Sequence, residues 1–326
     1  MNVRQKLIAL FENNRGQFLS GEELAEGLGC SRAAVWKAVA ALKKEGYAID
    51  AVTGRGYRLG AQTDVLSEAG IRKYLTGRGR ELSLDVRQSV TSTNTVLRGL
   101  AEQGAPEGTA VLSVTQTGGK GRLGRSFFSP ADTGLYMSIL MRPQMSAADS
   151  VRITTAAAIA VSKAVEDCGG GETAIKWVND VCLRGKKICG ILTEASFSAE
   201  NGGLDYAVTG IGINAYEPEG GFPPEIADVA GAVFQSRRED MRNRLAGAVL
   251  SRFWECYHDL FSAGALEYYR SRLMWRGERI RVISGQSEYP AVLLDVDDSY
   301  ALRVRLDDGT GKSVSSGEIT IRRTEK

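Results

Sequence analysis

Glycine and positive charge alternate between residues 118 and 130, which read GGKGRLGRSFFSP. Four glycines lie among Lys120, Arg122 and Arg125. Glycine lets backbone N–H groups approach an anion closely, and neighbouring cations neutralise the charge of that anion. The residue types in this segment therefore suit three uses: holding a phosphate, contacting nucleic acid, or forming a solvated basic turn.

Two well-known phosphate loops do not fit these residues. In the Walker loop a serine or threonine follows the Gly-Lys pair, whereas Gly121 follows Gly119 and Lys120 here. A dinucleotide loop has the spacing G-x-G-x-x-G, which this segment matches as far as Gly124, but it also requires a helix directly afterwards. An apolar, strand-like run follows instead. A flexible basic hairpin stays open as the alternative.

Two further segments make a phosphate site the favoured interpretation. The segment KWVND, residues 176–180, brings a cation, an amide and a carboxylate to the end of an apolar run. The segment TGIGIN, residues 209–214, places two glycines on another apolar run, where a ligand can approach the backbone closely. Each segment alone also fits a solvated lysine or a β-bulge. Together with residues 118–130 they predict a nucleotide-phosphate site.

The composition is that of an ordinary globular protein. The 326 residues suffice for two or three domains, and the net charge of +2 confines any anion site to a local patch. Five cysteines without a C-x-x-C pair favour free thiols over disulfides or zinc. The single histidine, His258, lies in a helix-like run, so histidine acid–base catalysis is not favoured. No run approaches 18 apolar residues, and the sequence predicts a cytoplasmic protein without a membrane partner.

Residues 1–62 have the pattern of a winged helix-turn-helix domain. Apolar residues recur at helical spacing near the start of the chain, and residues 20–23 form a capping box before a second helix. A tight turn separates that helix from a third helical pattern over residues 31–46. Two extended runs around residues 54–56 then predict a β-hairpin wing.

The third helix and the wing carry the side chains that we expect to contact DNA, namely Ser31, Arg32 and Lys37 on the helix and Arg55 and Arg58 on the wing. The N-terminal part of a recognition helix presents donors to base edges in the major groove, and cations on a wing face backbone phosphates. Helical spacing alone leaves a small protein-interaction domain open as an alternative. The predicted wing favours DNA binding.

The remainder of the chain predicts two more domains in a protein of the α+β class. Residues 63–274 alternate helices and strands as a mixed α/β domain with a largely antiparallel sheet. The helical patterns cover residues 67–75, 91–104, 146–169, 240–261 and 265–273, and the strand-like runs cover residues 108–117, 134–143, 173–183, 187–197 and 205–216. Residues 275–326 carry short strands with tight turns, which predict a five-stranded SH3-like β-barrel.

Six segments together resemble those of the bifunctional bacterial biotin–protein ligases that also repress the biotin operon. They are TSTN (91–94), GKGRLGR (119–125) with FFSP shortly after it, KWVND (176–180), KKICGILTE (186–194), GIGIN (210–214) and SGEITIR (316–322). Their order and spacing, between a winged helix and a small barrel, extend the resemblance over essentially the whole chain. It implies that the central domain is a ligase domain of the class II synthetase-like type.

The resemblance implies two chemical steps. The carboxylate of biotin attacks the α-phosphate of ATP, giving biotinyl-5′-adenylate and pyrophosphate, and a lysine of a biotin carboxyl carrier protein then attacks the adenylate. Biotin, ATP and Mg²⁺ are the implied ligands, and operator DNA and a ligand-linked homodimer are the implied partners. Neither step needs a nucleophile from the enzyme, so positioning and cations would supply most of the catalysis.

Roles for individual residues follow from the same resemblance. The implied catalytic residues are Lys176, Lys187 and Arg122. The implied biotin-binding residues are Ser92, Thr93, Gln116, Gly119, Lys120, Lys187, Gly190, Ile191, Gly210 and Gly212. The implied ATP- and adenylate-binding residues are Arg122, Arg125, Phe127, Lys176, Asn179 and Asn214. No residue is assigned as a resident metal ligand, and the glycine-rich segment is interpreted as a lid over biotin and the adenylate.

Some residues depart from the family pattern, and three alternatives stay open. Lys120 and Leu123 stand where arginine is usual, and Phe127 stands where tryptophan is usual; lysine lacks the bidentate fork of arginine. The alternatives are a regulator that only senses the adenylate, a lipoate ligase, and a ligase whose N-terminal domain does not bind DNA. The three implied catalytic cations disfavour the first, and the absence of an Arg-Arg-x-Ser-Gly-Gly-Gly segment disfavours the second.

Overall fold

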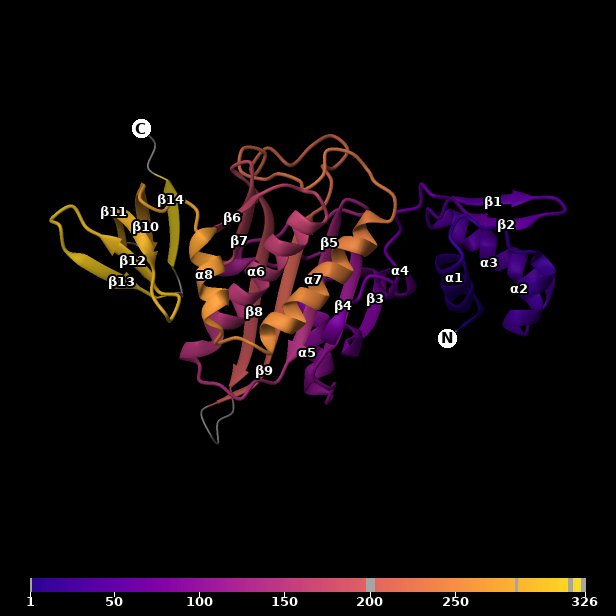
Figure 1. Cartoon of the computed structure of the whole chain (residues 1–326), viewed down its shortest axis with the longest axis horizontal. Helices are drawn as coiled ribbons and strands as arrows, with labels where there is room; N and C mark the ends of the chain where they lie inside the picture. Colours follow the sequence, from indigo (N-terminus) through magenta and orange to yellow (C-terminus); the bar gives the residue numbers. More distant parts are fainter. Residues whose placement is uncertain (1, 198–202, 285–286, 316–318, 324–326) are drawn as a thin grey trace. The chain divides into compact units, whose positions relative to one another are not determined.

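The chain divides into two compact units. The computed structural model describes residues 2–197, 203–284, 287–315 and 319–323 (Figure 1). The first unit consists of Met1–Leu75 and Ser236–Ala248, and the second of Thr76–Gln235 and Val249–Lys326. Helix α7, Met241–Tyr257, begins in the first unit and ends in the second. The domain boundaries 1–62, 63–274 and 275–326 remain a prediction.

The first unit contains the predicted helix-turn-helix and wing. Its elements are α1 (Val3–Asn13), α2 (Gly21–Leu28), α3 (Arg32–Lys44), the antiparallel strands β1 (Ile49–Val52) and β2 (Gly56–Leu59), and the short α4 (Glu68–Arg72). The Ser20–Glu23 capping box forms as predicted, and Gly29 ends α2 in the left-handed region at φ +65°. Ser31 caps α3 by accepting a hydrogen bond from the Ala34 N–H.

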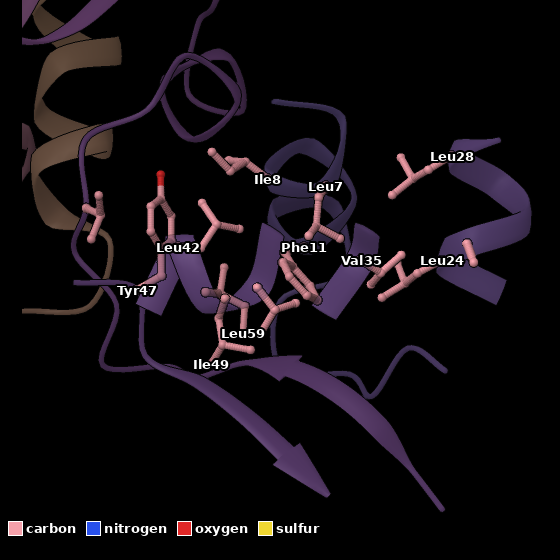
Figure 2. Packing of buried hydrophobic residues seen from close by; sticks show 13 residues of the cluster. Leu7, Ile8, Phe11, Leu24, Leu28, Val35, Leu42, Tyr47, Ile49 and Leu59 are labelled. Atoms are coloured by element: carbon pink, nitrogen blue, oxygen red, sulfur yellow. The ribbon is translucent and has the colours of Figure 1, made fainter. Parts of the chain in front are cut away.

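One apolar cluster holds these short elements together. Figure 2 shows side chains from all three long helices and both strands meeting in the centre of the unit. Leu7, Val35, Leu42 and Leu59 are fully buried there, and Phe11 is 2% exposed. Burying a side chain of this size contributes about 1.5–3 kcal/mol, so this cluster is the main source of stability for helices that are too short to persist alone.

A buried ionic cluster joins α1 to the segment 236–248. Asp240 lies 2.9 Å from the guanidinium of Arg15 and 2.6 Å from the ammonium of Lys73. The same lysine lies 2.6 Å from Glu12, whose side chain is fully buried. Each buried carboxylate thus has two cationic partners, which offsets the desolvation of the charges. This cluster explains why residues from the start of α7 belong to the first unit.

We expect Gly56→Ala to destabilise the wing more than Gly54→Ala. Both glycines have positive φ, of +94° and +80°, which strains any side chain. A Cβ at position 56 would lie 2.0 Å from the carbonyl oxygen of Leu19, whereas a Cβ at position 54 meets nothing within 4 Å. Urea unfolding of the full chain should show a loss of about 1–3 kcal/mol for Gly56→Ala beyond that for Gly54→Ala. Equal losses of unfolding free energy in the two variants would contradict a steric clash at position 56.

A seven-stranded sheet forms the centre of the second unit. Its strands are β3 (Ser83–Val90), β4 (Thr109–Gln116), β5 (Gly134–Met141), β6 (Thr173–Lys176), β7 (Asp180–Leu183), β8 (Lys186–Phe197) and β9 (Leu204–Asn214). They are ordered β3-β4-β5-β9-β8-β7-β6. Among the described strands of this sheet, β3 and β4 pair in parallel and the other neighbours pair antiparallel. The predicted largely antiparallel sheet is confirmed.

Helices pack on the strands of this sheet. They are α5 (Thr93–Glu102), α6 (Val151–Asp167) and α8 (Ala263–Ser271), with α7 entering from the first unit and the 3₁₀ turns η1 (Gly77–Glu81), η2 (Arg122–Gly124) and η3 (Ala148–Ser150). Helix α5 packs on β4, β5 and β9, and α6 packs on β6 to β9 (Figure 1). No helix within the described ranges is long and apolar enough to span a membrane.

Two of the predicted elements differ from the structure. The apolar run 173–183 is two strands, β6 and β7, joined by a tight turn, because Lys176 pairs with Asp180 in the hairpin register. The helical pattern 146–169 begins with η3 rather than with α6, and the Ser146 hydroxyl accepts a hydrogen bond from the Asp149 N–H at 3.3 Å. The N-cap residue of α6, Ser150, makes no side-chain capping bond.

Residues 279–323 form the predicted five strands. They are β10 (Arg279–Ser284), β11 (Ser287–Val296), β12 (Leu302–Arg305), β13 (Gly311–Val314) and β14 (Ile319–Arg323), in the order β13-β12-β11-β10-β14. Fully buried Val282, Leu293 and Val304 form its core. The indole N–H of Trp177 donates to the Tyr300 carbonyl at 2.9 Å, which ties this sheet to the β6–β7 turn. The first three residues of the predicted motif SGEITIR, 316–318, lie outside the described residues.

Candidate functional site

Two adjoining cavities lie at the seven-stranded sheet. The small cavity, of about 130 Å³, is enclosed by the start of α5, the segment 120–127 and strands β8 and β9. The large cavity, of about 590 Å³, is enclosed by strands β6 and β7, residues 222–230 and Trp275. The residues that line both cavities are Arg125, Ser126, Phe127, Asp180 and Lys187. An extended ligand with two chemically different ends can therefore span both cavities.

The small cavity has a polar end at the start of α5. The backbone N–H of Thr93 donates to the side-chain oxygen of Gln116 at 2.8 Å, and the amide nitrogen of Gln116 donates to Ser129 at 2.9 Å. Ser92 is 3% exposed, and its side chain does not cap α5. Fixed amide and hydroxyl groups in a narrow cavity suit a small polar head group.

Further polar side chains extend from this end, with Asn94 lining the cavity and Ser138 and Glu194 behind it. The hydroxyl oxygen of Ser138 lies 2.7 Å from that of Thr93 and 2.6 Å from the amide oxygen of Asn94. The Asn94 amide nitrogen donates to Glu194 at 2.8 Å and to the Leu192 carbonyl at 3.2 Å. These side chains were not assigned a role from the sequence, because a serine inside an apolar strand carries no spacing signal.

Glycines on β8 and β9 form the floor of the small cavity. A Cβ at Gly210 would lie 2.2 Å from the amide oxygen of Asn94, and a Cβ at Gly212 would lie 2.6 Å from the ring of Phe127. A Cβ at Gly190 would lie 3.1 Å from the side chain of Lys187. Side chains from other elements thus lie directly on the strand backbone, so glycine is required at Gly210 and Gly212.

The glycine-rich segment is a hairpin whose half-buried cation, Arg122, reaches the β6–β7 turn. Gly121 N–H donates to the Arg125 carbonyl at 2.7 Å. The guanidinium of Arg122 donates to the side-chain oxygen of Asn179 at 3.0 Å. Burial lowers the pKa of Arg122, an effect that the nearby carboxylate of Asp180 opposes. The group remains positive at neutral pH, so it offers a partly desolvated cation to an anionic ligand.

An ion pair forms part of the wall between the cavities. The ammonium of Lys187 lies 2.6 Å from the carboxylate of Asp180. Lys187 is on β8 and Asp180 is on β7, which pair antiparallel. The ring of Phe127 lies beside them and meets Tyr136 edge-on at 6.4 Å between centroids. A reacting centre at this wall would face the ammonium of Lys187, which is paired with the Asp180 carboxylate.

Cations gather in the large cavity. The ammonium of Lys176 lies 5.3 Å from the ring centroid of Trp275. Burial lowers the pKa of Lys176, Asp180 opposes the shift, and the neighbouring charges of Lys187 and Arg322 lower the pKa further. Several cations that repel one another in one cavity favour a multiply charged anion such as a polyphosphate.

The donor set fits a magnesium ion that arrives with phosphate. Across the described residues no group of three or more His, Cys, Asp or Glu side chains could hold a metal ion. Mg²⁺ commonly takes one or two protein carboxylates and completes its shell with water and phosphate oxygens. Asp180, with the amide of Asn179 beside it in sequence, meets that requirement.

The structure brings together almost all of the residues assigned from the sequence. Those lining the small cavity are Ser92, Thr93, Gln116, Lys120, Arg122, Arg125, Phe127, Asn179, Lys187, Gly190, Ile191, Gly210 and Gly212. Lys176 and Asn214 line the large cavity. Gly119 lies beneath the lining, where a Cβ would be 2.4 Å from the Phe127 carbonyl. Arg122 and Asn179, assigned to the nucleotide, line the small cavity rather than the large one.

The winged helix-turn-helix presents a hollow between α3 and the wing. Arg32 and Arg55 line it, together with Trp36, which is 62% exposed. The guanidinium of Arg55 stacks on Phe18 at 4.2 Å from the ring centroid. Lys37 is exposed on the same helix, whereas the Ser31 side chain is used in capping α3. Trp36 was not singled out from the sequence, because its helical position did not show that the ring is exposed.

Comparison with known proteins bears on both halves of the chain. Residues 3–58 match the family described as HTH domain, and residues 86–214 match the biotin/lipoate A/B protein ligase family. The solved structure of biotin protein ligase from Aquifex aeolicus in complex with biotin and ATP is similar, with a TM-score of 0.63 and 27% identity. That similarity covers 74% of this chain and 99% of the other.

Two relatives are similar over nearly the full length. The bifunctional ligase/repressor BirA of Bacillus subtilis (strain 168) is 34% identical over 326 residues, with 98% of each chain covered. The protein of the same name from Escherichia coli (strain K12) is 30% identical over 330 residues, covering 99% of this chain and 98% of the other. The resemblance carried by the six segments is confirmed. The chain belongs to the family of bifunctional ligase/repressor BirA proteins.

Proposed function

We propose that this protein activates biotin with ATP, transfers it to a lysine of a biotin carboxyl carrier protein, and represses transcription through its winged helix-turn-helix. The observation that carries the catalytic half is the pair of adjoining cavities with Lys187 and Asp180 in their common wall. The relatives that cover nearly the whole chain are named ligase/repressors, which supports both halves.

The small cavity is proposed to bind biotin. Ser92, Thr93 and Gln116 offer hydroxyl and amide groups to the ureido ring, and the glycine floor leaves room for the bicyclic ring. The carboxylate of biotin then lies towards the shared wall, near Lys187 and Arg122. Two cations at this end hold a carboxylate without neutralising it covalently, so its oxygen stays available as a nucleophile.

The large cavity is proposed to bind ATP. Lys176 faces the phosphates, and Asn214 lies near the nucleoside, with its amide fixed by a 3.0 Å hydrogen bond to the Gly231 carbonyl. In the first step a biotin carboxylate oxygen forms a bond to the α-phosphorus, and the bond from that phosphorus to pyrophosphate breaks. In the second step the acceptor lysine nitrogen bonds to the acyl carbon, the acyl–phosphate oxygen bond breaks, AMP leaves, and the amine releases a proton.

The chain's own groups supply positioning and charge for these steps. Lys176 and Lys187 meet negative charge that increases on the phosphates in the transition state, and Arg122 holds the adenylate against loss to water. Mg²⁺, when bound with ATP, would add Lewis-acid stabilisation of the phosphates beside Asp180 and Asn179. The phenyl ring of Phe127 already lies on the cavity floor, and stacking of this ring on adenine stays a prediction.

Mass spectrometry tests the catalytic proposal directly. A biotin carboxyl carrier domain incubated with this protein, biotin and ATP–Mg²⁺ is expected to gain the mass of one biotinyl group, and the gain requires all three additions. Binding of biotin without any mass gain would instead support the alternative of a biotin-sensing regulator without ligase activity.

Contacts to operator DNA are proposed for Arg32, Lys37 and Arg55, with Ser31 at the start of the recognition helix. We expect Arg55→Ala to weaken binding to all DNA sequences and to lower the slope of log K against log salt by about one, since one phosphate contact is lost. Arg58→Ala is the matched control, because Arg58 is held by Asp50 in the free protein. Equal effects of the two variants on the salt slope would contradict a special role for Arg55.

Three further assignments are proposals: a homodimer, a lid and a cytoplasmic location. A ligand-linked homodimer fits β8, because β7 pairs only with its first residues and the later ones have no strand on that side within the described chain. Such an edge can pair with a second copy. The lid role of residues 118–130 and the cytoplasmic location stay predictions.

A further inference from the structure

Trp36 differs from the other three tryptophans of the chain in its surroundings. Trp177 and Trp254 are buried, and Trp275 lies against the ammonium of Lys176. The side chain of Trp36 is 62% exposed, and within the part of the chain that the structure describes it makes no hydrogen bond, ring contact or cation–π contact. A large aromatic ring left in water forgoes the burial that it would gain in a core. Folding therefore gives no reason for a tryptophan at this position.

Trp36 lies in the middle of the exposed face of α3. Arg32 is one helical turn before it and Ala40 one turn after it, and all three line the hollow between α3 and the wing. Ala33, on the same helix, is also exposed. Because the two alanines are short, the indole is the largest apolar group that this face presents to a partner.

The charges around the ring favour a polyanionic partner. Helix α3 carries Arg32, Lys37, Lys43 and Lys44 and no acidic residue. Arg55 of the wing lines the hollow, in which Glu22 is the one acidic lining residue. Cations gathered on one face attract the phosphates of a duplex, and a neutral apolar protein surface would gain nothing from them.

A duplex offers an exposed indole one apolar group at the base edges of the major groove. That group is the C5-methyl of thymine, since the other base edges there present hydrogen-bond donors and acceptors. The major groove is wide enough for an α-helix, so side chains in the middle of its exposed face reach the base edges. Contact between the indole and a thymine methyl would remove both from water.

We propose that Trp36 is a specificity-determining residue, which packs on the methyl group of a thymine in the major groove of the operator. This rests on the proposed function, in which α3 is the recognition helix of a repressor. The cations of α3 and the wing supply affinity for any duplex, whereas Trp36 supplies a preference for thymine at one position of the bound sequence.

Replacing thymine by uracil tests this contact, because the exchange removes only the methyl group. The full-length protein with biotin and ATP–Mg²⁺ first selects its site from random-sequence duplexes, and each thymine of that site is then replaced in turn. Wild-type affinity, measured by fluorescence anisotropy, is expected to fall about fourfold at one thymine position, the factor for one apolar carbon removed from water. Trp36→Ala is expected to bind the thymine site about ten- to a hundredfold more weakly, and to make no distinction between thymine and uracil at that position.

Two further measurements separate reading of a base from other roles. The salt slope of binding should stay the same in Trp36→Ala, since no phosphate contact is lost, and the thermal unfolding midpoint should stay the same because the ring is exposed. Phe261→Ala is the matched control, since Phe261 is 66% exposed in the second unit, and it should leave DNA affinity unchanged.

The outcomes that would overturn the inference differ from one another. An equal loss for every duplex in Trp36→Ala would place the ring on the sugar–phosphate backbone, and a lower unfolding midpoint would make its role structural. A selected site bound equally well by Trp36→Ala would overturn the role of Trp36 alone. A wild-type selection that enriches no sequence would overturn the proposed repressor and this inference with it.

Discussion

Replacing Lys187 by methionine is expected to lower the rate of adenylate formation by about a hundredfold or more. The ammonium lies in the wall between the two cavities, 2.6 Å from Asp180, where the carboxylate and the α-phosphate must meet. Removing one fixed donor at a centre of developing charge typically costs a factor of about 10²–10³. Methionine keeps the length of the side chain but leaves Asp180 with its negative charge facing the reactants, which adds to the loss.

Pyrophosphate release measures the first step, and the mass gain of the carrier domain measures the overall reaction. Lys186→Met is the matched control, because it removes the neighbouring lysine, which is exposed and donates to the Ala227 carbonyl. It is expected to keep most of the activity. Wild-type rates of pyrophosphate release in Lys187→Met would contradict the placement of this lysine at the reacting centre.

Lys176→Met is expected to abolish most of the activity while making the ligand-free protein more stable. Burial lowers the pKa of Lys176 below its ordinary value of 10.5, so the folded state disfavours the charged form that phosphate binding needs. Between the lowered pKa and the ordinary one, the unfolded chain binds more protons, and stability therefore rises with pH in that window. Below the window the full cost of burying the charge is present. Methionine removes this cost.

Thermal unfolding at neutral pH should show a midpoint about 1–3 °C higher for Lys176→Met than for the wild type. This difference between the two midpoints should become smaller as the pH rises towards 10.5. Titration with ATP should show weakened binding, with biotin affinity unchanged. Lys163→Met is the matched control, since Lys163 also lies over an aromatic ring, 4.6 Å from the centroid of Tyr268, but lines neither cavity. A lower unfolding midpoint for Lys176→Met would show that the stabilisation from the contact between Lys176 and Trp275 exceeds the cost of burying the charge.

Much of the fold could be predicted because local signals and tertiary packing agree. Ser20 with Glu23, and Gly29, mark the ends of α2 in the sequence, and the structure uses them in that way. The sequence predicts a single strand over residues 173–183, because apolar periodicity does not reveal the β6–β7 turn, which contains no glycine or proline. The place of residues 236–248 in the first unit depends on Asp240 finding Arg15 and Lys73 across the chain, which no local pattern encodes.

Some residues of the candidate site could likewise be predicted from the sequence, and others could not. Gln116 and Gly210 could be assigned because the resemblance implied their roles, and the structure gives a physical reason for each. Ser138 and Glu194 were missed because each acts through another side chain rather than by lining the cavity. In the large cavity, Trp275 lies outside the six segments, and Arg322 ends the SGEITIR segment but has no role assigned from the sequence. Side-chain contacts that form only when strands distant in the sequence pair cannot be predicted from the spacing of residues along the chain.

The winged helix-turn-helix cannot be separated from the rest of the chain without losing residues that belong to its compact unit. Its compact unit is built from two stretches of chain, and Asp240 supplies a charge that Arg15 and Lys73 need. A fragment ending at residue 62 would lose both Lys73 and Asp240 and leave Glu12 and Arg15 as a pair without their other partners. Moving the winged helix-turn-helix into another protein, by recombination or by engineering, therefore requires moving the start of α7 with it. A fusion that carried only the N-terminal residues would lack part of the buried ionic cluster.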